Sequence, residues 1–395
     1  MSCRPHDDPC GAAVPRATVA AVKIAGRDRP PDVEIVGGSF AGLACAHACA
    51  ARGVRTLVRD RKREPGDAVH TTGLLVKEVA DAIDVPTRLT RKIAGIRLYG
   101  PSHRWIDLDE PGYSFLATDT QGLMRWFAER ATDAGAALRW GSPFRGDRTG
   151  RFLVGADGPS SAVARTSGLG TNHAFLAGVE MELEPVPGLA ERLHVFLDSR
   201  LAPGYIGWVV PGVGVTQVGL ACRRPVRPDL EAFIRSIADV IDLRGSRRLS
   251  RRGGQIPVNG PVRPFGSATA VLVGDAAGLV SPLTGGGIHT ALVSGRDAGI
   301  AIASHLLDGG PSPVDALAAS RGRSWPKQLL RAGLDMRPPN ALLDAVLANA
   351  AFAGLARMVF FHHRGLLSPA AWRALATSRD PGTGAVSSTR ATPRA

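Results

Sequence analysis

The chain has 395 residues, of which 44% are hydrophobic, so it is long and apolar enough for a large α/β body or several domains. No apolar run is long enough to predict a membrane-spanning helix, and five cysteines without a C-x-x-C pattern indicate reduced thiols and a cytoplasmic location. The net charge of +13 is spread along an arginine-rich chain, and its densest cluster, within 244–252, lacks the interleaved aromatic residues of a nucleic-acid platform. We therefore expect no nucleic-acid partner and interpret that cluster as a solvated face.

A stretch near residue 40 has the pattern of a dinucleotide-binding turn. Strand formers at 33–36 are followed by a helical pattern over 43–53, and Gly37, Ser39 and Gly42 lie at the three glycine positions of G-x-G-x-x-G. The first glycine permits a tight turn, the second position must be small enough for backbone to approach a pyrophosphate, and the third lets the helix pack on the strand. Because serine replaces the middle glycine, the loop alone also fits an ordinary strand–helix turn.

A second strand over 54–60 ends at Asp60, which follows Gly42 by 18 residues. An acidic residue at this point of a dinucleotide fold accepts hydrogen bonds from the adenosine ribose. The alternative is a strand-end aspartate in solvent, and the spacing favours the ribose contact.

The other elements follow from periodicity. Residues 1–31 show no sustained period and predict a disordered extension, whereas 341–361 predict a packed or interfacial helix. The expected helices before 260 cover 76–83, 121–134 and a segment near 228–242. A hairpin over 93–99 and 105–108 and a mostly antiparallel sheet within 173–258 are also expected; the strands of that sheet are 175–184, 192–198, 205–210 and 213–221.

Two further turns follow buried strands later in the chain. Asp157 and Gly158 follow a strand over 151–155, and Gly274 and Asp275 follow a strand over 270–273. A run of three glycines, Gly285–Gly287, then leads into a long helix over 288–307.

These motifs, in this order, resemble the p-hydroxybenzoate-hydroxylase-type FAD-dependent oxidoreductases. The run over 274–288 and the sequence Pro-Gly-Tyr-Ile-Gly-Trp-Val-Val-Pro at 203–211 resemble the geranylgeranyl reductase branch of that superfamily. The resemblance covers roughly residues 32–310. It implies an α/β fold, with a single Rossmann-type FAD-binding domain, an inserted antiparallel-sheet substrate domain and a C-terminal helical segment.

The resemblance also implies domain boundaries. The FAD-binding domain would comprise 32–90, 109–172 and 262–310, and the substrate domain 91–108 and 173–261. C-terminal helices over 311–378 and a tail over 379–395 would follow.

The resemblance implies that the first loop holds the AMP and pyrophosphate end of FAD, whereas the triple glycine faces the isoalloxazine ring. The expected cofactor contacts are Gly37, Gly38, Ser39, Phe40, Ala41, Gly42, Asp60, Arg61, Thr72, Gly73, Asp157, Gly274, Asp275, Pro282, Gly285, Gly286, Gly287 and Ile288.

Three features depart from the family pattern. Thr120 lies where an arginine often contacts FAD, and Thr71 and Thr72 lie in the region where many lipid-reducing members carry a cysteine. Residues 141–151 are fewer than the usual connection before the Asp-Gly motif, so a small sheet there would be reduced or missing.

The implied reaction is reduction of C=C bonds in an isoprenoid or other apolar substrate by hydride transfer from reduced flavin. Expected proton sources are Tyr205 or a water held by His70, Thr71 or Thr72. NADPH or NADH would serve as a transient reductant, and the protein would make peripheral contact with a membrane that holds its lipid substrate. The alternatives are a flavin monooxygenase that uses O2, a non-redox polyene cyclase and a flavin-binding protein without turnover.

Overall fold

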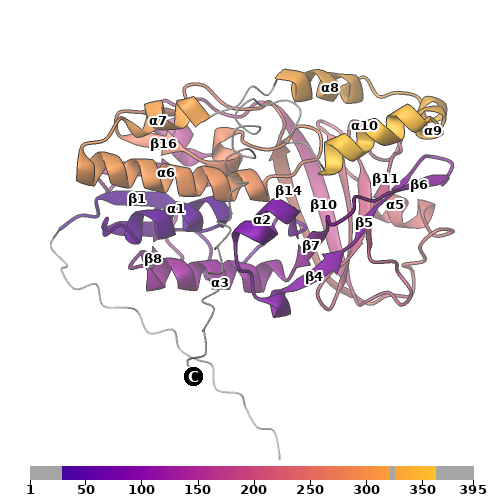
Figure 1. Cartoon of the computed structure of the whole chain (residues 1–395), viewed down its shortest axis with the longest axis horizontal. Helices are drawn as coiled ribbons and strands as arrows, with labels where there is room; N and C mark the ends of the chain where they lie inside the picture. The colour runs from indigo at the N-terminus through magenta and orange to yellow at the C-terminus, as the bar shows by residue number, and fades with distance from the viewer. Residues whose placement is uncertain (1–28, 321–324, 362–395) are drawn as a thin grey trace, which may run out of the picture.

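The computed structural model describes residues 29–320 and 325–361, which form two lobes side by side (Figure 1). Most of the expected N-terminal extension and the whole expected tail over 379–395 lie outside the described residues. The first lobe is a parallel sheet with helices, and the second is a larger, mostly antiparallel sheet. This mixed architecture confirms the predicted fold class.

The first lobe is built on a sheet of six strands in the order β15-β16-β9-β1-β2-β8. Five of them run parallel, and β15 is antiparallel to its neighbour β16. The carboxyl ends of the parallel strands therefore lie along one edge. The strands are β1 (Val33–Val36), β2 (Thr56–Arg59), β8 (Ala137–Arg139), β9 (Phe152–Gly155), β15 (Gly266–Ser267) and β16 (Ala270–Leu272).

Helices α1 (Phe40–Ala50), α3 (Thr120–Asp133) and α6 (Ile288–Asp308) share one apolar core with the first sheet. Helix α4 (Ala162–Thr166) and the short helix η2 (Gly274–Ala277) belong to a second core, which β9 and β16 also join. Cys45 and Cys49 on α1 are fully buried in the first core. Both cysteines therefore serve as small packing residues of this core.

Helices α1 and α6 pack closely because α6 has glycines where they meet. A Cβ atom at Gly295 would lie 2.1 Å from the Ala41 carbonyl oxygen, and one at Gly299 would lie 2.6 Å from the Cys45 carbonyl oxygen. The two contacts advance by four residues on both helices, so α1 and α6 run parallel. Phe40, where α1 begins, is therefore level with residue 294, and α6 begins six residues earlier, at Ile288.

The second lobe is a sheet of seven strands in the order β14-β10-β13-β12-β11-β5-β6. Helix α5 (Leu230–Ser236) shares a core with one face of it. The strands are β5 (Gly95–Tyr99), β6 (Trp105–Leu108), β10 (Phe175–Leu183), β11 (Arg192–Phe196), β12 (Gly207–Pro211), β13 (Thr216–Arg223) and β14 (Arg248–Pro257). The hairpin predicted over 93–108 is confirmed as β5 and β6, which pair antiparallel.

A third sheet, in the order β3-β7-β4, begins after β2 in the chain. Among the described residues no strand lies between Trp140 and Arg151, as expected from the short connection there. The elements of this region are β3 (Leu74–Leu75), α2 (Lys77–Ala82), η1 (Thr87–Leu89), β4 (Thr90–Ile93) and β7 (Phe115–Thr118).

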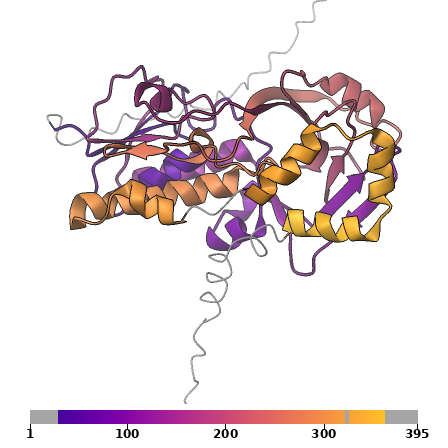
Figure 2. The ribbon, with the colours of Figure 1, turned by 90° about the horizontal axis from the view of Figure 1, so that it is seen from above.

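The C-terminal helices extend from the first lobe over the second (Figure 2). Phe361 is buried in a core with residues of β5, β11 and β12, which anchors the last helix on the second sheet. No single described helix is long and apolar enough to cross a membrane, although α9 and α10 together pass that test as a pair bent by 92°. The helices are α7 (Pro313–Ser320), α8 (Trp325–Asp335), α9 (Asn340–Leu347) and α10 (Ala350–Phe361).

Three predicted elements need correction. The helix expected near 228–242 ends at Ser236, because residues 237–241 form turns that keep the apolar spacing without a continuous helix. The segment expected over 341–361 is two helices with a break at 348–349. The arginine cluster is not wholly solvated, since residues 248–257 form β14 and Arg252 is only 15% exposed and ion-paired.

Candidate functional site

The glycine and aspartate turns predicted to bind a cofactor lie together at the carboxyl edge of the first sheet. Gly37 follows β1, Asp60 follows β2, Asp157 follows β9 and Asp275 follows β16. Trp140, which follows β8, joins them at the same edge. Ligands of open α/β sheets bind outside this edge, so the arrangement has the form of a dinucleotide site.

The loop at Gly37 forms a cradle that side chains would fill. A Cβ atom at Gly37, where φ is +110°, would lie 2.2 Å from the Ala156 carbonyl oxygen, and one at Gly42 would lie 1.8 Å from the Gly37 carbonyl oxygen. Helix α1 begins after Ser39, which makes no side-chain capping hydrogen bond, and its first turn carries no acidic residue. Its first N–H groups and its dipole are therefore available to a phosphate, which fits a pyrophosphate.

Gly38, Phe40 and Ala41, which were predicted to contact the cofactor, are all buried. Gly38 is buried and donates its N–H to the Asp60 carboxylate at 2.7 Å. Phe40 is buried against Phe127, with ring centroids 5.9 Å apart, and Ala41 lies against α6. Phe40 and Ala41 can therefore contribute to the site mainly through their backbone.

Asp60 is held by the backbone around it. Besides Gly38, the Lys62 N–H donates to its carboxylate, at 2.8 Å. A carboxylate has about four acceptor positions, so two remain for ribose hydroxyls. Arg61 next to it is exposed. The Trp140 ring covers the same spot, because a Cβ atom at Gly38 would lie 2.5 Å from the edge of that ring.

Asp157 has a clear structural role. Its carboxylate accepts a hydrogen bond from the Ser161 hydroxyl at 2.6 Å and from the N–H groups of Ala162 and Val163 at 2.6 and 3.1 Å. It therefore caps the start of α4 and fixes the turn after β9. Its contact with the cofactor stays a prediction.

The triple glycine creates a second open helix start. Helix α6 begins after Gly287 with no side-chain cap and no acidic residue in its first turn. Helix α6 begins six residues before the position that is level with the start of α1. It therefore extends about 9 Å further than α1 in the N-terminal direction. Two parallel helix starts, offset along one edge, fit a ligand with two electron-rich parts such as FAD. Pro282 and Ile288 at this start are buried, whereas Gly286 is exposed.

Asp275 lies beneath this second helix start. A Cβ atom at Gly287 would come within 3.3 Å of its Oδ1, so the glycine keeps room above the carboxyl group. Removal from water raises the pKa of Asp275 to about 6. Gly274 lies against both Ala41 and Ala291, and so joins α1 to α6.

The segment that contains the expected flavin-facing residues crosses between the two lobes. The His70 ring lies 3.0 Å from the Gly253 carbonyl oxygen on β14, measured from Nδ1, and the Thr72 hydroxyl donates to the Glu180 carboxylate on β10. Gly73 is attached to β7, because its carbonyl oxygen accepts a hydrogen bond from the Thr118 hydroxyl at 2.8 Å. Burial lowers the pKa of His70, so its ring is neutral at neutral pH.

Tyr205 meets the glycine loop from the second lobe. A Cβ atom at Gly285, where φ is +60°, would lie 2.2 Å from the Tyr205 hydroxyl oxygen. Burial raises the pKa of Tyr205, so the phenol keeps its proton throughout the neutral range. The structure thus brings Tyr205 to the triple glycine, and it brings His70 and Thr72 to the neighbouring edge of the second sheet.

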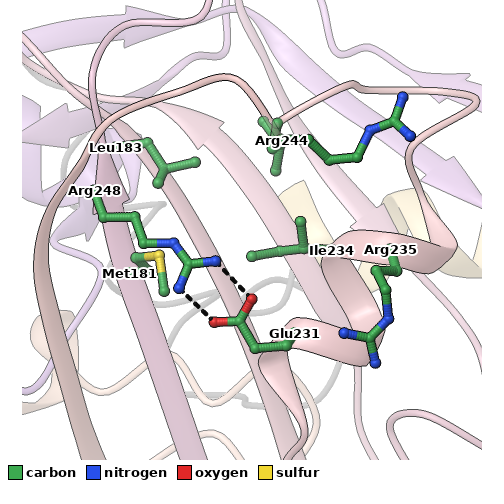
Figure 3. Close-up of a pocket in the computed structure, with 8 residues that line it drawn as sticks. Met181, Leu183, Glu231, Ile234, Arg235, Arg244 and Arg248 are labelled. Carbon is green, nitrogen blue, oxygen red and sulfur yellow. Dashed lines mark hydrogen bonds and ion pairs between the residues drawn. The ribbon is translucent and has the colours of Figure 1, made fainter.

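A pocket on the opposite face of the second sheet is separate from these residues. Figure 3 shows that Arg248 there is ion-paired with Glu231 on α5, and Met181 and Leu183 from β10 form part of its lining. These two side chains belong to the core on the α5 side of the sheet. The pocket therefore lies apart from the predicted site.

Comparison with known proteins identifies the chain. Residues 35–89 match a family profile described as an NAD(P)-binding Rossmann-like domain. The chain is 30% identical over 313 residues to digeranylgeranylglycerophospholipid reductase 2 of Methanothermobacter thermautotrophicus, which covers 70% of this chain and 80% of that protein. The chain belongs to the geranylgeranyl reductase family of FAD-dependent oxidoreductases. The predicted family is thereby confirmed, and FAD is its cofactor.

Further similarities, in sequence and in structure, are also to geranylgeranyl reductases. The geranylgeranyl diphosphate reductase of Rhodobacter capsulatus is 27% identical over 312 residues, or 72% of this chain and 78% of that protein. A geranylgeranyl bacteriochlorophyll reductase-like structure from Thermoplasma acidophilum superposes with a TM-score of 0.74 at 22% identity, covering 88% of this chain and 99% of that one. A flavin-dependent brominase has the same fold at a TM-score of 0.59 and 16% identity, covering 88% and 98%.

Sequence reasoning missed two residues of the site. Trp140 follows a three-residue strand and belongs to no motif, although its place one residue after β8 puts it at the ligand edge. Glu180 was missed because the alternation around it is typical of a strand with one solvated face. In the structure that face is covered, and Glu180 is only 5% exposed.

Proposed function

We propose that this member of the geranylgeranyl reductase family reduces C=C bonds of an isoprenoid or similarly apolar chain by hydride transfer from reduced FAD. The similarity to a digeranylgeranylglycerophospholipid reductase carries the proposal, because an aligned length of 313 residues must include both lobes. The substrate would lie between the triple-glycine loop and the face of the second sheet that bears Trp208.

The chain's own residues would hold the cofactor at two points. The N–H groups at the start of α1 would bind the pyrophosphate, with Asp60 on the ribose. The N–H groups at the start of α6 would face the flavin edge where negative charge develops, which favours the reduced state. FAD, when bound there, supplies the hydride.

The second carbon of the double bond needs a proton, and Tyr205 is better placed to supply it than a water held by His70, Thr71 or Thr72. Its hydroxyl lies at Gly285 and retains its proton at neutral pH. The Thr72 proton is instead directed to Glu180. His70 is neutral, and its Nδ1 faces a carbonyl oxygen. We expect Tyr205→Phe to lower turnover without loss of FAD.

We propose NADPH or NADH as the transient electron donor. Among the described residues there is one sheet with a dinucleotide cradle, and FAD would occupy it. A nicotinamide cofactor would therefore bind briefly at the flavin rather than in a site of its own.

Anaerobic incubation of the FAD-bound protein with NADPH and geranylgeranyl diphosphate, followed by mass analysis, tests the proposed reaction. A gain of two hydrogens per reduced double bond is expected. An aerobic sample that instead gains an oxygen atom would identify a monooxygenase. An unchanged substrate mass in both samples would leave a cyclase or a flavin-binding protein without turnover, and a gain of hydrogens excludes both.

We also propose that the protein works in the cytoplasm at a membrane surface. Large apolar side chains on and next to the last helices point to solvent, namely Met336 (84% exposed), Leu342 (50%) and Leu355 (42%). The exposed Arg337 lies beside Met336 and would face anionic headgroups. Sedimentation with anionic vesicles should be lost in Leu342→Glu. Equal sedimentation of this variant would contradict the proposal.

A further inference from the structure

Glu180 is a buried charged residue that the proposed reaction leaves without a role. It lies on β10 and is 5% exposed, on the face of the sheet opposite Met181 and its apolar core. A carboxylate removed from water is costly unless hydrogen bonds and an opposite charge compensate it.

Both oxygens of Glu180 are fully engaged. Oε2 accepts a hydrogen bond from Trp208 Nε1 at 3.0 Å and a second from the Thr72 hydroxyl. Oε1 accepts from Nε of Arg252 at 2.9 Å and from its Nη2. A carboxylate with both oxygens engaged in this way holds its partners in place, so it acts through them.

The strand register explains how these partners meet. Trp208 on β12 lies opposite Gly219 on β13, Gly219 lies opposite Glu180, and Glu180 lies opposite Arg252 on β14. A Cβ atom at Gly219 would lie 2.2 Å from the Trp208 ring. The indole therefore passes across β13 through the gap that this glycine leaves, and its N–H reaches the carboxylate.

The third partner, Thr72, comes from the other lobe. Thr72 belongs to the segment before β3, and it precedes Glu180 by 108 residues. The same segment is also attached to β14, because His70 contacts the carbonyl oxygen of Gly253, the residue that follows Arg252. The segment expected to face the flavin is thus fastened to the sheet expected to face the substrate.

We propose that Glu180 is a positioning residue that sets the separation between the flavin-facing segment and the Trp208 wall of the substrate site. This inference rests on the proposed function. With the indole and Thr72 held by one carboxylate, a flexible apolar chain has a fixed wall to lie against, and one of its double bonds is kept within reach of the cofactor.

The test uses the FAD-bound protein as Glu180→Gln, Thr72→Val and a control, Glu182→Gln. Glu182 lies on the same face and bonds Arg252 and Ser250, but it touches neither Thr72 nor Trp208. With NADPH as electron donor and geranylgeranyl diphosphate as substrate under anaerobic conditions, kcat should fall on the order of tenfold to a hundredfold in the first two variants, with a smaller change in KM. The flavin circular dichroism of these two variants should change as well, although their FAD content stays the same. The control Glu182→Gln should keep the wild-type kcat and the wild-type flavin circular dichroism.

Tryptophan fluorescence provides a readout that is independent of turnover. Glu180→Gln should change the emission of the protein but not that of a Trp208→Phe background. Equal loss of kcat in Glu180→Gln and Glu182→Gln, or the same emission change without Trp208, would overturn the proposal. If Glu180→Gln does not fold, Thr72→Val removes one bond of the same carboxylate with little change in shape. If the wild type binds FAD but leaves the lipid unchanged, the proposed function fails, and the dichroism and fluorescence still decide the role of Glu180.

Discussion

Replacement of Asp275 by asparagine should change how the stability of the FAD-free protein depends on pH. The pKa of the folded carboxyl group is about 6, above its ordinary value of 3.8, because burial disfavours the charge. The folded state therefore binds the proton more tightly than the unfolded state. Its stabilising effect is complete below the ordinary pKa and is lost as the pH rises through about 6.

The magnitude follows from the two pKa values. A shift of roughly two units corresponds to about 3 kcal/mol of unfolding free energy, at 1.36 kcal/mol per unit. Asp275→Asn removes the titration and should therefore gain up to about 3 kcal/mol relative to the wild type between about pH 4 and about pH 7.

Urea unfolding of both proteins at the two pH values measures this difference. Asp242→Asn is the matched control. The Asp242 carboxylate accepts hydrogen bonds from Arg244, which lower its folded pKa to about 2, so it stays ionised in the folded state at both pH values and its replacement should change the same difference little. A stability difference between Asp275→Asn and wild type that is equal at both pH values would refute the assigned burial of Asp275.

Three other substitutions test the geometry of the cofactor site. Gly42→Ala should abolish FAD binding, since its Cβ would lie 1.8 Å from the Gly37 carbonyl oxygen; retention of FAD on purification would contradict the cradle. Gly285→Ala should lower FAD content and turnover, and added Tyr205→Phe should restore part of the FAD content, but not the turnover, because it removes the hydroxyl that the new Cβ meets. No restoration would mean that backbone strain alone is responsible. Trp140→Ala should weaken FAD binding by about fivefold but leave FMN binding unchanged, because the ring lies at the adenosine end and aromatic contacts are worth about 1 kcal/mol. An equal loss for FMN would contradict that placement.

The sequence predicted the first lobe well because its signals are local. Buried strands followed by glycine turns and helix starts identify β1, β9 and β16 together with their loops, and parallel pairing then brings these loops to one edge. The long helix after Gly287 was predicted nearly to its last residue.

The sequence did not predict β14 or Glu180, because both depend on contacts far along the chain. Residues 248–257 are rich in arginine and contain two glycines, which disfavour a strand locally. They form one because Arg252 and Ser250 meet Glu180 and Glu182 across the pair with β10. The burial of Glu180 likewise requires Thr72 from the other lobe, which no spacing within β10 reports.

Anaerobic reoxidation of the reduced, FAD-bound protein by geranylgeranyl diphosphate shows whether the flavin delivers its hydride to the isoprenoid. We expect the flavin absorbance to return without oxygen, at a rate that saturates with substrate, and one double bond to be reduced for each FAD reoxidised. A flavin that stays reduced until oxygen is admitted would contradict this expectation.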